Sequence, residues 1–394
     1  MDLRGWLKLY ESASNHPITA WADPAGQVLV ANQCPSAVAG PRGSSRRCLG
    51  HAVTQLIPPN PCPTSLCDRR ERDATLLPSQ GSGLAQPVVF TQEFLAEFRD
   101  AEAPLRTGLL RQLSNVVPED LPGLLAAWYT TNDERRRHIV RRLVELSQVE
   151  ADVNFDDVFR FCLDDADADV RSRAIGGLAD CEDRWFMNRL MELLGSDPVP
   201  HVRAAAAQGL GRFVYLAELG ELRPRDRSTV EDGLFASLDR PGQPLDVRRR
   251  VVEALGAFSD ARVAELIGHA YADPEPLMRV SALCAMGRSC DPFWLPTILR
   301  ELRSPRADMR HEAVLACREM ADPAAVPSLV PLLEDDSVRL RIAVLGVLGA
   351  LGGKVAERTI VGCLDHPDAA TRRAAAQALH ELRFSDDPLT ADPD

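Results

Sequence analysis

Cysteine and histidine in the first 87 residues are the side chains best suited by type to hold a metal ion. Cys48 and His51 are separated by two residues, and Cys62 and Cys67 by four. Two closely spaced pairs of thiolate and imidazole ligands are what a tetrahedral zinc site requires. The ten prolines and seven glycines of residues 1–87 favour a largely disordered extension instead, and zinc at these four positions is the alternative.

The same segment contains one pattern typical of a β-hairpin. Two short runs rich in β-formers, Ile18–Trp21 and Val28–Val30, flank the turn-forming residues Asp23–Gly26. We therefore expect an extension over 1–87, a repetitive domain over 88–385, and a solvated acidic tail over 386–394.

Beyond the extension, an arginine returns at a nearly constant interval. The last five of these arginines, from Arg248 to Arg372, follow one another at intervals of 31 residues. Apolar residues lie three and seven positions after each arginine, on one stripe of a helix. A period of this length predicts a solenoid of stacked units. The series comprises Arg106, Arg136, Arg171, Arg203, Arg248, Arg279, Arg310, Arg341 and Arg372.

Each unit is predicted to be a pair of helices. A second apolar segment separates the arginine helices, as at Phe293–Leu299 and Val326–Leu333. An aspartate often lies six residues before the arginine, as at Asp165 and Asp197, where it can begin a helix. The sequence thus predicts an all-α fold, a solenoid of about nine helical hairpins.

Segments such as Asp273–Gly287 resemble HEAT repeats of the bacterial phycobilin-lyase-like class. The resemblance extends from about Val88 to about Phe384, roughly three quarters of the chain. It implies a right-handed α-α superhelix in which aspartate and arginine form a ladder between neighbouring units, so the arginine series is expected to be structural. It implies little about function, because proteins similar to this one include lyases, hydroxylases and scaffolds.

Two enzymatic alternatives come from this resemblance. Arg310-His311-Glu312 is similar to the His-Glu motif of deoxyhypusine hydroxylase, which holds two irons with such dipeptides on several repeats. A di-iron site needs several imidazole and carboxylate ligands, and the equivalent positions of the other repeats lack them. A bilin lyase would hold a tetrapyrrole, but Trp128, Trp185 and Trp294 lie in distant repeats. We therefore expect no catalytic residue and no cofactor.

The distribution of charge narrows the class of partner. The chain carries a formal net charge of −12, and residues 88–394 hold 37 Lys and Arg against 51 Asp and Glu. An acidic solenoid repels phosphate backbones, so we expect no nucleic-acid partner. The N-terminus lacks the apolar core of a signal peptide, and no window approaches 18 apolar residues. We expect a monomeric cytoplasmic protein with no membrane partner.

The leading hypothesis is a non-catalytic scaffold or adaptor that binds a protein or peptide, with basic segments, on its concave face. Residues one and five positions after the repeated arginines lie off the apolar stripe and are expected to face the groove. The candidate binding residues are Arg249, Glu253, His311, Arg373 and Gln377.

One interval is longer than the rest of the series. Arg203 and Arg248 are 45 residues apart, and the excess falls between Tyr215 and Ser228. Insertions in repeat arrays map to loops and often to binding faces. We therefore expect a loop here, either a second binding element or an inert connection.

Overall fold

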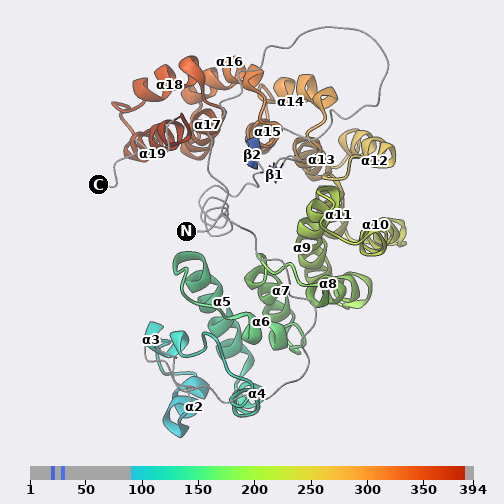
Figure 1. The fold of residues 1–394 in the computed structure, drawn as a ribbon, viewed down its shortest axis with the longest axis vertical. Coiled ribbons are helices and arrows are strands. Elements are labelled where there is room, and N and C mark those ends of the chain that lie inside the picture. The colour runs from blue at the N-terminus through green and yellow to red at the C-terminus, as the bar shows by residue number, and fades with distance from the viewer. Residues whose placement is uncertain (1–18, 23–27, 32–89, 387–394) are drawn as a thin grey trace. The chain divides into compact units, whose positions relative to one another are not determined.

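The computed structural model describes residues 19–22, 28–31 and 90–386 (Figure 1). The chain divides between Pro87 and Val88 into two units, which are described separately. In the first unit, β1 (Thr19–Ala22) and β2 (Val28–Ala31) pair antiparallel, with Thr19 opposite Ala31. The predicted hairpin is confirmed in these two strands. The candidate zinc ligands Cys48, His51, Cys62 and Cys67 and the acidic tail from 387 onward lie outside the described residues.

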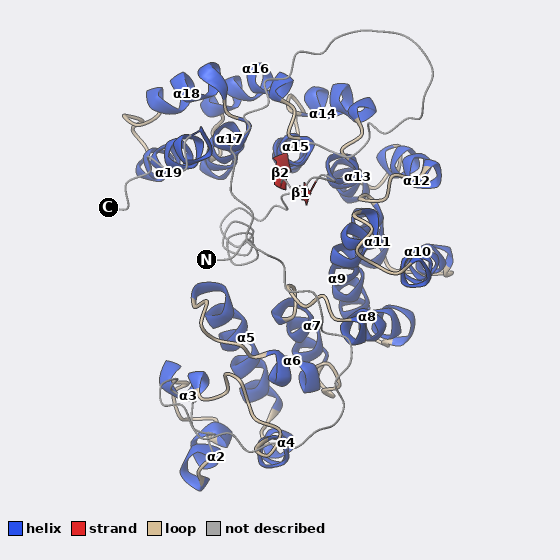
Figure 2. Ribbon diagram, in the orientation of Figure 1, coloured by secondary structure: helices blue, strands red, loops and turns tan. Residues whose placement is uncertain are grey.

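Residues 90–386 are helical, with no strand in this range, and form nine helical pairs (Figure 2). The first helices of the pairs are α2 Gln92–Arg99, α4 Leu121–Thr130, α6 Asp156–Cys162, α8 Arg184–Ser196, α10 Pro224–Asp239, α12 Ala261–Tyr271, α14 Leu295–Glu301, α16 Val326–Leu329 and α18 Gly353–Gly362. The second helices are α3 Thr107–Arg111, α5 Asp133–Val149, α7 Ala168–Gly177, α9 Pro200–Glu218, α11 Leu245–Leu255, α13 Pro276–Ser289, α15 Ala307–Met320, α17 Val338–Leu351 and α19 Ala369–Asp386. Short 3-10 helices adjoin α14 and α16, namely η1 Pro292–Trp294, η2 Pro323–Ala325 and η3 Val330–Glu334.

The helices of this unit form two layers along a curved path, as the predicted solenoid requires. Successive odd-numbered helices from α5 to α19 pack on one another and lie on the inner side of the curve (Figure 1). From α6 onward the even-numbered helices lie on the outer side, each against its odd-numbered partner, whereas α2 packs on α4. None of the helices in the described part of the chain is long and apolar enough to cross a membrane.

Local sequence explains where these helices begin and which face they bury. The Asn132 side chain accepts a hydrogen bond from the Arg135 backbone N–H at 2.8 Å and so caps α5. Proline occupies the first turn of α9, α10 and α13, where its missing N–H has no intrahelical partner to lose. The buried stripe of α11, Val247, Val251, Val252 and Leu255, has the spacing that the sequence predicted.

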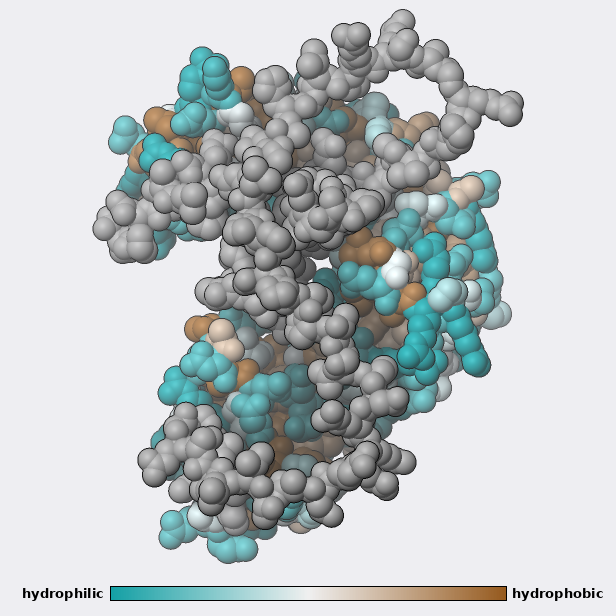
Figure 3. Space-filling model, viewed as in Figure 1, coloured by the Kyte–Doolittle hydropathy of each residue, from teal (hydrophilic) through white to brown (hydrophobic). Residues whose placement is uncertain are grey.

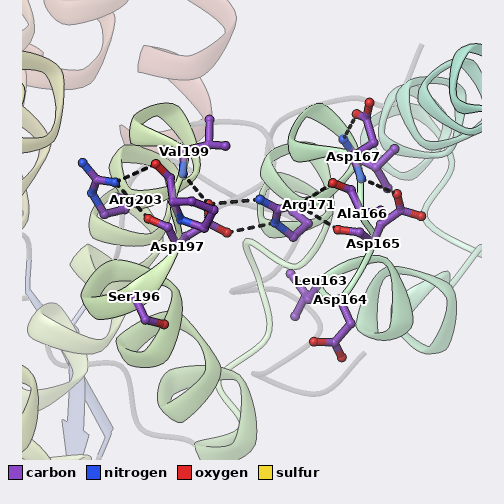
Figure 4. A network of polar contacts seen from close by, with 12 residues as sticks. Leu163, Asp164, Asp165, Ala166, Asp167, Arg171, Ser196, Asp197, Val199 and Arg203 are labelled. Atoms are coloured by element: carbon purple, nitrogen blue, oxygen red, sulfur yellow. Dashed lines mark hydrogen bonds and ion pairs between the residues drawn. The ribbon is translucent and has the colours of Figure 1, made fainter.

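Aspartate and arginine join successive inner helices through a ladder of ion pairs (Figure 4). Arg171 binds both carboxylate oxygens of Asp197, at 2.9 and 3.0 Å, while its Nη1 donates to the Asp165 carbonyl at 2.8 Å. Asp165 in turn pairs with Arg136 of the preceding repeat at 3.0 Å. Each aspartate therefore links the arginine of the repeat before it to the arginine six residues after it.

The ladder continues, less regularly, toward the C-terminus. Arg310 pairs with Asp335 at 2.9 Å, and Arg248 and Arg341 approach Asp273 and Asp368 at 3.6 and 3.7 Å. These pairs are more exposed to solvent than those of Arg136 and Arg171.

Four members of the predicted arginine series depart from this pattern. Arg106 is the N-cap residue of α3, is exposed and pairs with Glu97, so its assignment to the ladder is wrong. Arg203 donates to the Gln243 side chain in place of a carboxylate. Arg279 and Arg372 donate to backbone carbonyls of their own repeats, because serine stands at position 304 and no described repeat follows α19.

Arginine also takes a position that the sequence pattern reserves for an apolar residue. Arg135, which precedes the ladder member Arg136, is only 3% exposed. Its guanidinium donates to the backbone carbonyls of Phe98, Ala103 and Glu97 at 2.5 to 3.2 Å. Arg135 therefore connects α5 to the first helical pair, the role that the sequence assigned to Arg106.

Glycine and alanine bring several inner helices into close backbone contact. A Cβ atom on Gly256 would lie 2.6 Å from Ala285 Cα, and one on Gly287 would lie 2.8 Å from Ala316 Cα. A Cβ atom on Gly349 would likewise lie 2.9 Å from the carbonyl oxygen of Ala378. These glycine–alanine contacts join α11 to α13, α13 to α15 and α17 to α19.

The expected insertion between Tyr215 and Ser228 is not a loop. The extra residues lengthen α9 and α10, and only residues 219–223 connect them. Asp226 is buried and pairs with Arg184 at 2.8 Å, while the Arg227 guanidinium lies 4.7 Å from the centre of the Phe258 ring. The side chains thought to form a free loop instead pack against neighbouring helices.

Candidate binding face

The inner helices share a set of positions on the side opposite their apolar stripe. These positions lie one, two, five and nine residues after the repeated arginine. We call the surface formed by these positions of α5 to α19 the inner face. At about 100° per residue, these four positions fall within an arc of about 100° around the helix axis, opposite the apolar stripe. Polar residues of successive repeats therefore lie side by side on this face.

The centre of the inner face holds a hydrogen-bonded group from α11 and α13. Glu253 is 7% exposed, accepts a hydrogen bond from Ser281 Oγ at 2.6 Å and pairs with Arg250 at 2.6 Å. Arg249 Nε donates to the same Ser281 Oγ at 3.0 Å and to the Leu277 carbonyl at 3.1 Å. The Arg288 guanidinium donates to the Glu253 carbonyl at 2.9 Å.

Glu312 of α15 lies beside this group and has an unusual protonation equilibrium. Burial, together with the nearby Glu253, raises the pKa of Glu312 to about 7, against the opposing effects of a hydrogen bond from Cys284 and the charge of Arg288. Burial also raises the pKa of the Cys284 thiol, so this cysteine stays protonated at neutral pH. The Glu312 carboxyl can therefore change its charge near neutral pH when a cation approaches.

The structure divides the five predicted binding residues into three groups. Arg373 and Gln377 are exposed on α19, and Gln377 donates to Glu381 at 3.0 Å. His311 is half-buried, and its pKa is lowered by burial and by Arg339. Glu253 is buried and Arg249 is held by α13, so the expectation that these two face the groove freely is wrong.

Sequence reasoning missed Ser281, Cys284, Arg288 and Glu312. Cys284 lies five positions after Arg279, which is the spacing used to choose Glu253, but its apolar surroundings suggested a core residue. Ser281 and Glu312 lie two positions after their arginines, and Arg288 lies nine after. A helical projection of all repeats, rather than two selected positions, could have found them.

The residues behind the enzymatic alternatives are placed as follows. Among the described residues, no three of the types His, Cys, Asp and Glu lie close enough to hold a metal ion. Trp128 and Trp294 are buried in the helical packing, and Trp128 Nε1 donates to the ladder residue Asp165 at 2.6 Å. Trp185 stacks with the guanidinium of Arg160 at 4.4 Å. The three tryptophans thus have packing roles in separate repeats.

Comparisons with known proteins agree with this architecture. The family model of HEAT repeats matches residues 157–234 and 295–380, and that of the PBS lyase HEAT-like repeat matches residues 247–273. No curated protein matches the chain.

Solved structures similar to the chain are distant in sequence. They include the CpcE–CpcF complex of phycocyanin lyase from Nostoc sp. PCC7120, with 18% identity, a TM-score of 0.44, and coverage of 72% of this chain and 99% of that one. Human deoxyhypusine hydroxylase has 19% identity and a TM-score of 0.32 over 74% of this chain and 95% of its own. Kap95p, in a structure with RanGDP, has 13% identity and a TM-score of 0.38 over 75% of this chain and 42% of its own. The matched residues therefore form HEAT-type repeats, one of them of the PBS lyase HEAT-like type, in agreement with the stacked helical pairs of residues 90–386.

Proposed function

We propose that residues 88–385 act as an interaction scaffold that binds a protein or peptide on the inner face. The observation that carries this proposal is the contrast between positions within the repeats. The ladder arginine recurs from α5 to α19, whereas the inner-face positions differ from helix to helix. A varied, continuous row of side chains on a regular framework is the kind of surface that solenoids use to select partners.

The charge of the repeat region as a whole, rather than that of the inner face, favours a partner with basic segments. Acidic residues outnumber basic ones in residues 88–394, 51 against 37. Hydrophilic side chains also cover the region of α10 and α12 on the face shown in Figure 3. On the inner face, Glu253 and Glu319 lie near Glu312, and after burial the charges of these two carboxylates raise the pKa of Glu312 further. A lysine or arginine of the partner would relieve the repulsion among these carboxylates.

Photo-cross-linking in native cells tests the proposal. The cross-linking amino acid benzoylphenylalanine replaces Arg173 or Gln377 on the inner face, and Glu265 or Arg358 on outer helices, all four being exposed. We expect a defined cross-linked protein from the inner positions and none from the outer ones. Cross-links restricted to the outer positions would contradict the proposal. Iron or a visible-light chromophore at one equivalent in the purified chain would instead support the hydroxylase or the lyase alternative.

A further inference from the structure

The inner face of α17 is apolar and open to solvent. Its four inner-face positions are Ile342, Ala343, Gly346 and Ala350. Ile342 is 40% exposed, and Val338, one turn before it, is 37% exposed. A Cβ atom on Gly346 would have no neighbour within 4 Å. Large side chains left this exposed together with small residues on one helix face point to an interaction surface rather than to ordinary surface scatter.

The other inner helices from α5 to α19 differ from α17 at these positions. Each of them carries at least one charged side chain there, such as Arg137 in α5, Arg173 in α7, Arg212 in α9, Arg288 in α13 and Glu319 in α15. In α17 all four positions are uncharged and apolar. Of the inner helices from α5 to α19, α17 alone therefore has no charged residue at these positions, while the other helices combine charged residues with apolar ones, and Leu277 of α13 is 41% exposed.

Charged residues border this helix at both of its ends. Beside its N-terminal half lies Arg373 of α19, with Arg339 in the first turn of α17 itself, while the lowered pKa of His311 on α15 leaves that side chain neutral near pH 7. Beside its C-terminal half, the ninth positions of α15 and α19 carry Glu319 and Glu381. We call Ile342, Gly346 and Ala350, with these flanking rows, the α17 trough. One end of the α17 trough is basic and the other is acidic.

Elsewhere on α17, a small residue is the point at which a neighbouring helix packs. On the side of α17 that faces α19, Gly349 contacts the backbone of Ala378, and this contact lets the two helices approach closely. Gly346, almost one turn away in the same helix, offers the same small surface with no helix against it. Helices pack where small residues let their backbones approach, so a further helix fits this face.

We propose that the α17 trough binds an amphipathic α-helix of the partner, acidic in its first turns and basic in its last turns. The inference rests on the proposed function and names one site within it. Acidic residues at a helix N-terminus and basic residues at its C-terminus also stabilise the helix itself through its dipole. Such a helix lies parallel to α17, with its acidic turn beside Arg339 and Arg373 and its basic turn beside Glu319 and Glu381.

The spacing of the flanking rows fixes the spacing of charges on the partner. The basic and acidic side chains are eight residues apart along α19, from Arg373 to Glu381. At about 1.5 Å per residue this is about 12 Å. The partner helix must therefore carry its acidic and basic side chains about eight residues apart, on either side of an apolar stripe.

Binding of designed peptides to the full chain tests the inference. The probe is a stapled, fluorescent helix with a Leu/Ala stripe flanked by two glutamates and, eight residues later, by two lysines. The control peptide has the glutamates and lysines exchanged, and its staple keeps it helical. We expect the probe to bind about tenfold or more tightly than the control in fluorescence anisotropy, with the preference falling as salt rises.

Variants of the chain locate the binding site. Ile342→Asp and Gly346→Leu should each weaken binding of the probe about tenfold, because one places a charge in the stripe and the other fills the open face. Val355→Asp, which changes an exposed valine of the outer helix α18, is the matched control and should leave binding unchanged. Circular dichroism should show that all three variants keep their helical content.

Equal binding of the two peptides, or unchanged binding to Ile342→Asp and Gly346→Leu, overturns the inference. Its failure can be distinguished from failure of the proposed function. If the peptides fail while inner-face cross-links at Arg173 or Gln377 identify a partner, only the α17 trough is wrongly assigned. If no inner-face position gives a cross-link, the scaffold proposal itself fails.

Discussion

The inner helices are joined differently in the N-terminal and C-terminal parts of the solenoid. From α5 to α9, buried ion pairs make the connection: the Arg136 and Asp165 side chains are 9% and 1% exposed, and those of Arg171 and Asp197 are 10% and 4% exposed. From α11 onward the corresponding pairs are more exposed to solvent. The side chains of Arg248 and Asp273, for example, are 42% and 20% exposed. There, contacts of Gly256, Gly287 and Gly349 with alanines bring the helix backbones together.

The contrast shows that equivalent positions in a repeat need not contribute equally to stability. A buried ion pair is sensitive to loss of either partner, because the remaining charge is left without compensation in a poorly solvated site. A glycine–alanine contact is sensitive instead to added volume, because the closest atoms belong to the backbone and cannot rotate away. Repeats of one type thus support two kinds of interface, with intervals of 35 and 32 residues from Arg136 to Arg203 and of 31 residues from Arg248 onward.

One interface in the C-terminal part lacks the glycine–alanine contact. Between α15 and α17, Arg318 and Val347 stand at the positions that Gly287 and Ala316 occupy between α13 and α15. Larger side chains at these positions keep two helix backbones farther apart. The α17 trough therefore lies on the helix whose contact with its preceding neighbour departs from the pattern.

Removing a ladder arginine in the N-terminal part should have the largest effect. Arg171→Ala should lower the free energy of unfolding by about 3 to 5 kcal/mol, because it leaves the buried Asp197 carboxylate without its guanidinium. Chemical unfolding followed by circular dichroism measures the change. Arg137→Ala is the control, since its pair with Asp167 is exposed on the arginine side, and it should leave stability nearly unchanged. Similar losses for the two variants would contradict the comparison.

Replacing glycine by alanine should have opposite effects at a glycine that contacts a neighbouring helix and at one that faces open space. Gly287→Ala should cost about 1 to 3 kcal/mol, because the new Cβ would lie 2.8 Å from Ala316 Cα in the neighbouring helix. Gly346→Ala should instead stabilise the chain by about 0.5 to 1 kcal/mol, because alanine favours the helix and this position is open. Both are measured as shifts in chemical unfolding. If both substitutions change the free energy of unfolding in the same direction, the close approach of Ala316 does not prevent a larger residue at position 287.

Much of the fold could be predicted from sequence because the repeat constrains it strongly. The recurrence of arginine and its apolar stripe identified the paired helices, and the resemblance to HEAT repeats implied the ladder in which Asp197 pairs with Arg171. The departures required knowledge of neighbours. Arg135 is buried because the carbonyls of Phe98 and Ala103 surround its guanidinium, and no periodicity indicates that.

The candidate site was harder to predict because it forms between repeats. Arg249 lies off the apolar stripe of its own helix, yet Ser281 of the next inner helix holds it. The raised pKa of Glu312 likewise depends on Glu253, from a helix two repeats earlier in the chain. The long interval after Arg203 suggested a loop because length alone cannot distinguish an inserted loop from longer helices.

The pH dependence of stability tests whether the centre of the inner face holds a strained carboxyl. The folded chain binds the Glu312 proton more tightly than the unfolded chain, because its folded pKa is about 7. Stability is therefore lost as pH rises from the ordinary range of glutamate through about 7. Glu312→Gln should remove this loss. The free energy of unfolding of the variant, relative to that of the native chain, should therefore increase between pH 5 and pH 8, by no more than about 2 kcal/mol.

Chemical unfolding at both pH values measures the effect on Glu312. Glu265→Gln, on the exposed face of the outer helix α12, is the matched control and should show no growth of this kind. If the free energies of unfolding of Glu312→Gln and the native chain instead differ by the same amount at pH 5 and pH 8, the pKa of Glu312 is not raised.

The smallest effect is expected where the ladder lacks its aspartate. Arg279→Ala should cost only about 1 kcal/mol, because this half-buried arginine donates to the Asp273 and Pro274 carbonyls and Ser304 occupies the place of the next aspartate. Ser304→Asp should supply the missing carboxylate, since Ser304 precedes Arg310 by six residues as Asp335 precedes Arg341. In the Ser304→Asp background, Arg279→Ala should then cost more, and the double-mutant cycle should give a favourable coupling of about 1 kcal/mol. Zero coupling would mean that the aspartate position alone does not create a ladder pair, and that the helix spacing set by Gly287 and Ala316 decides whether the two side chains can meet.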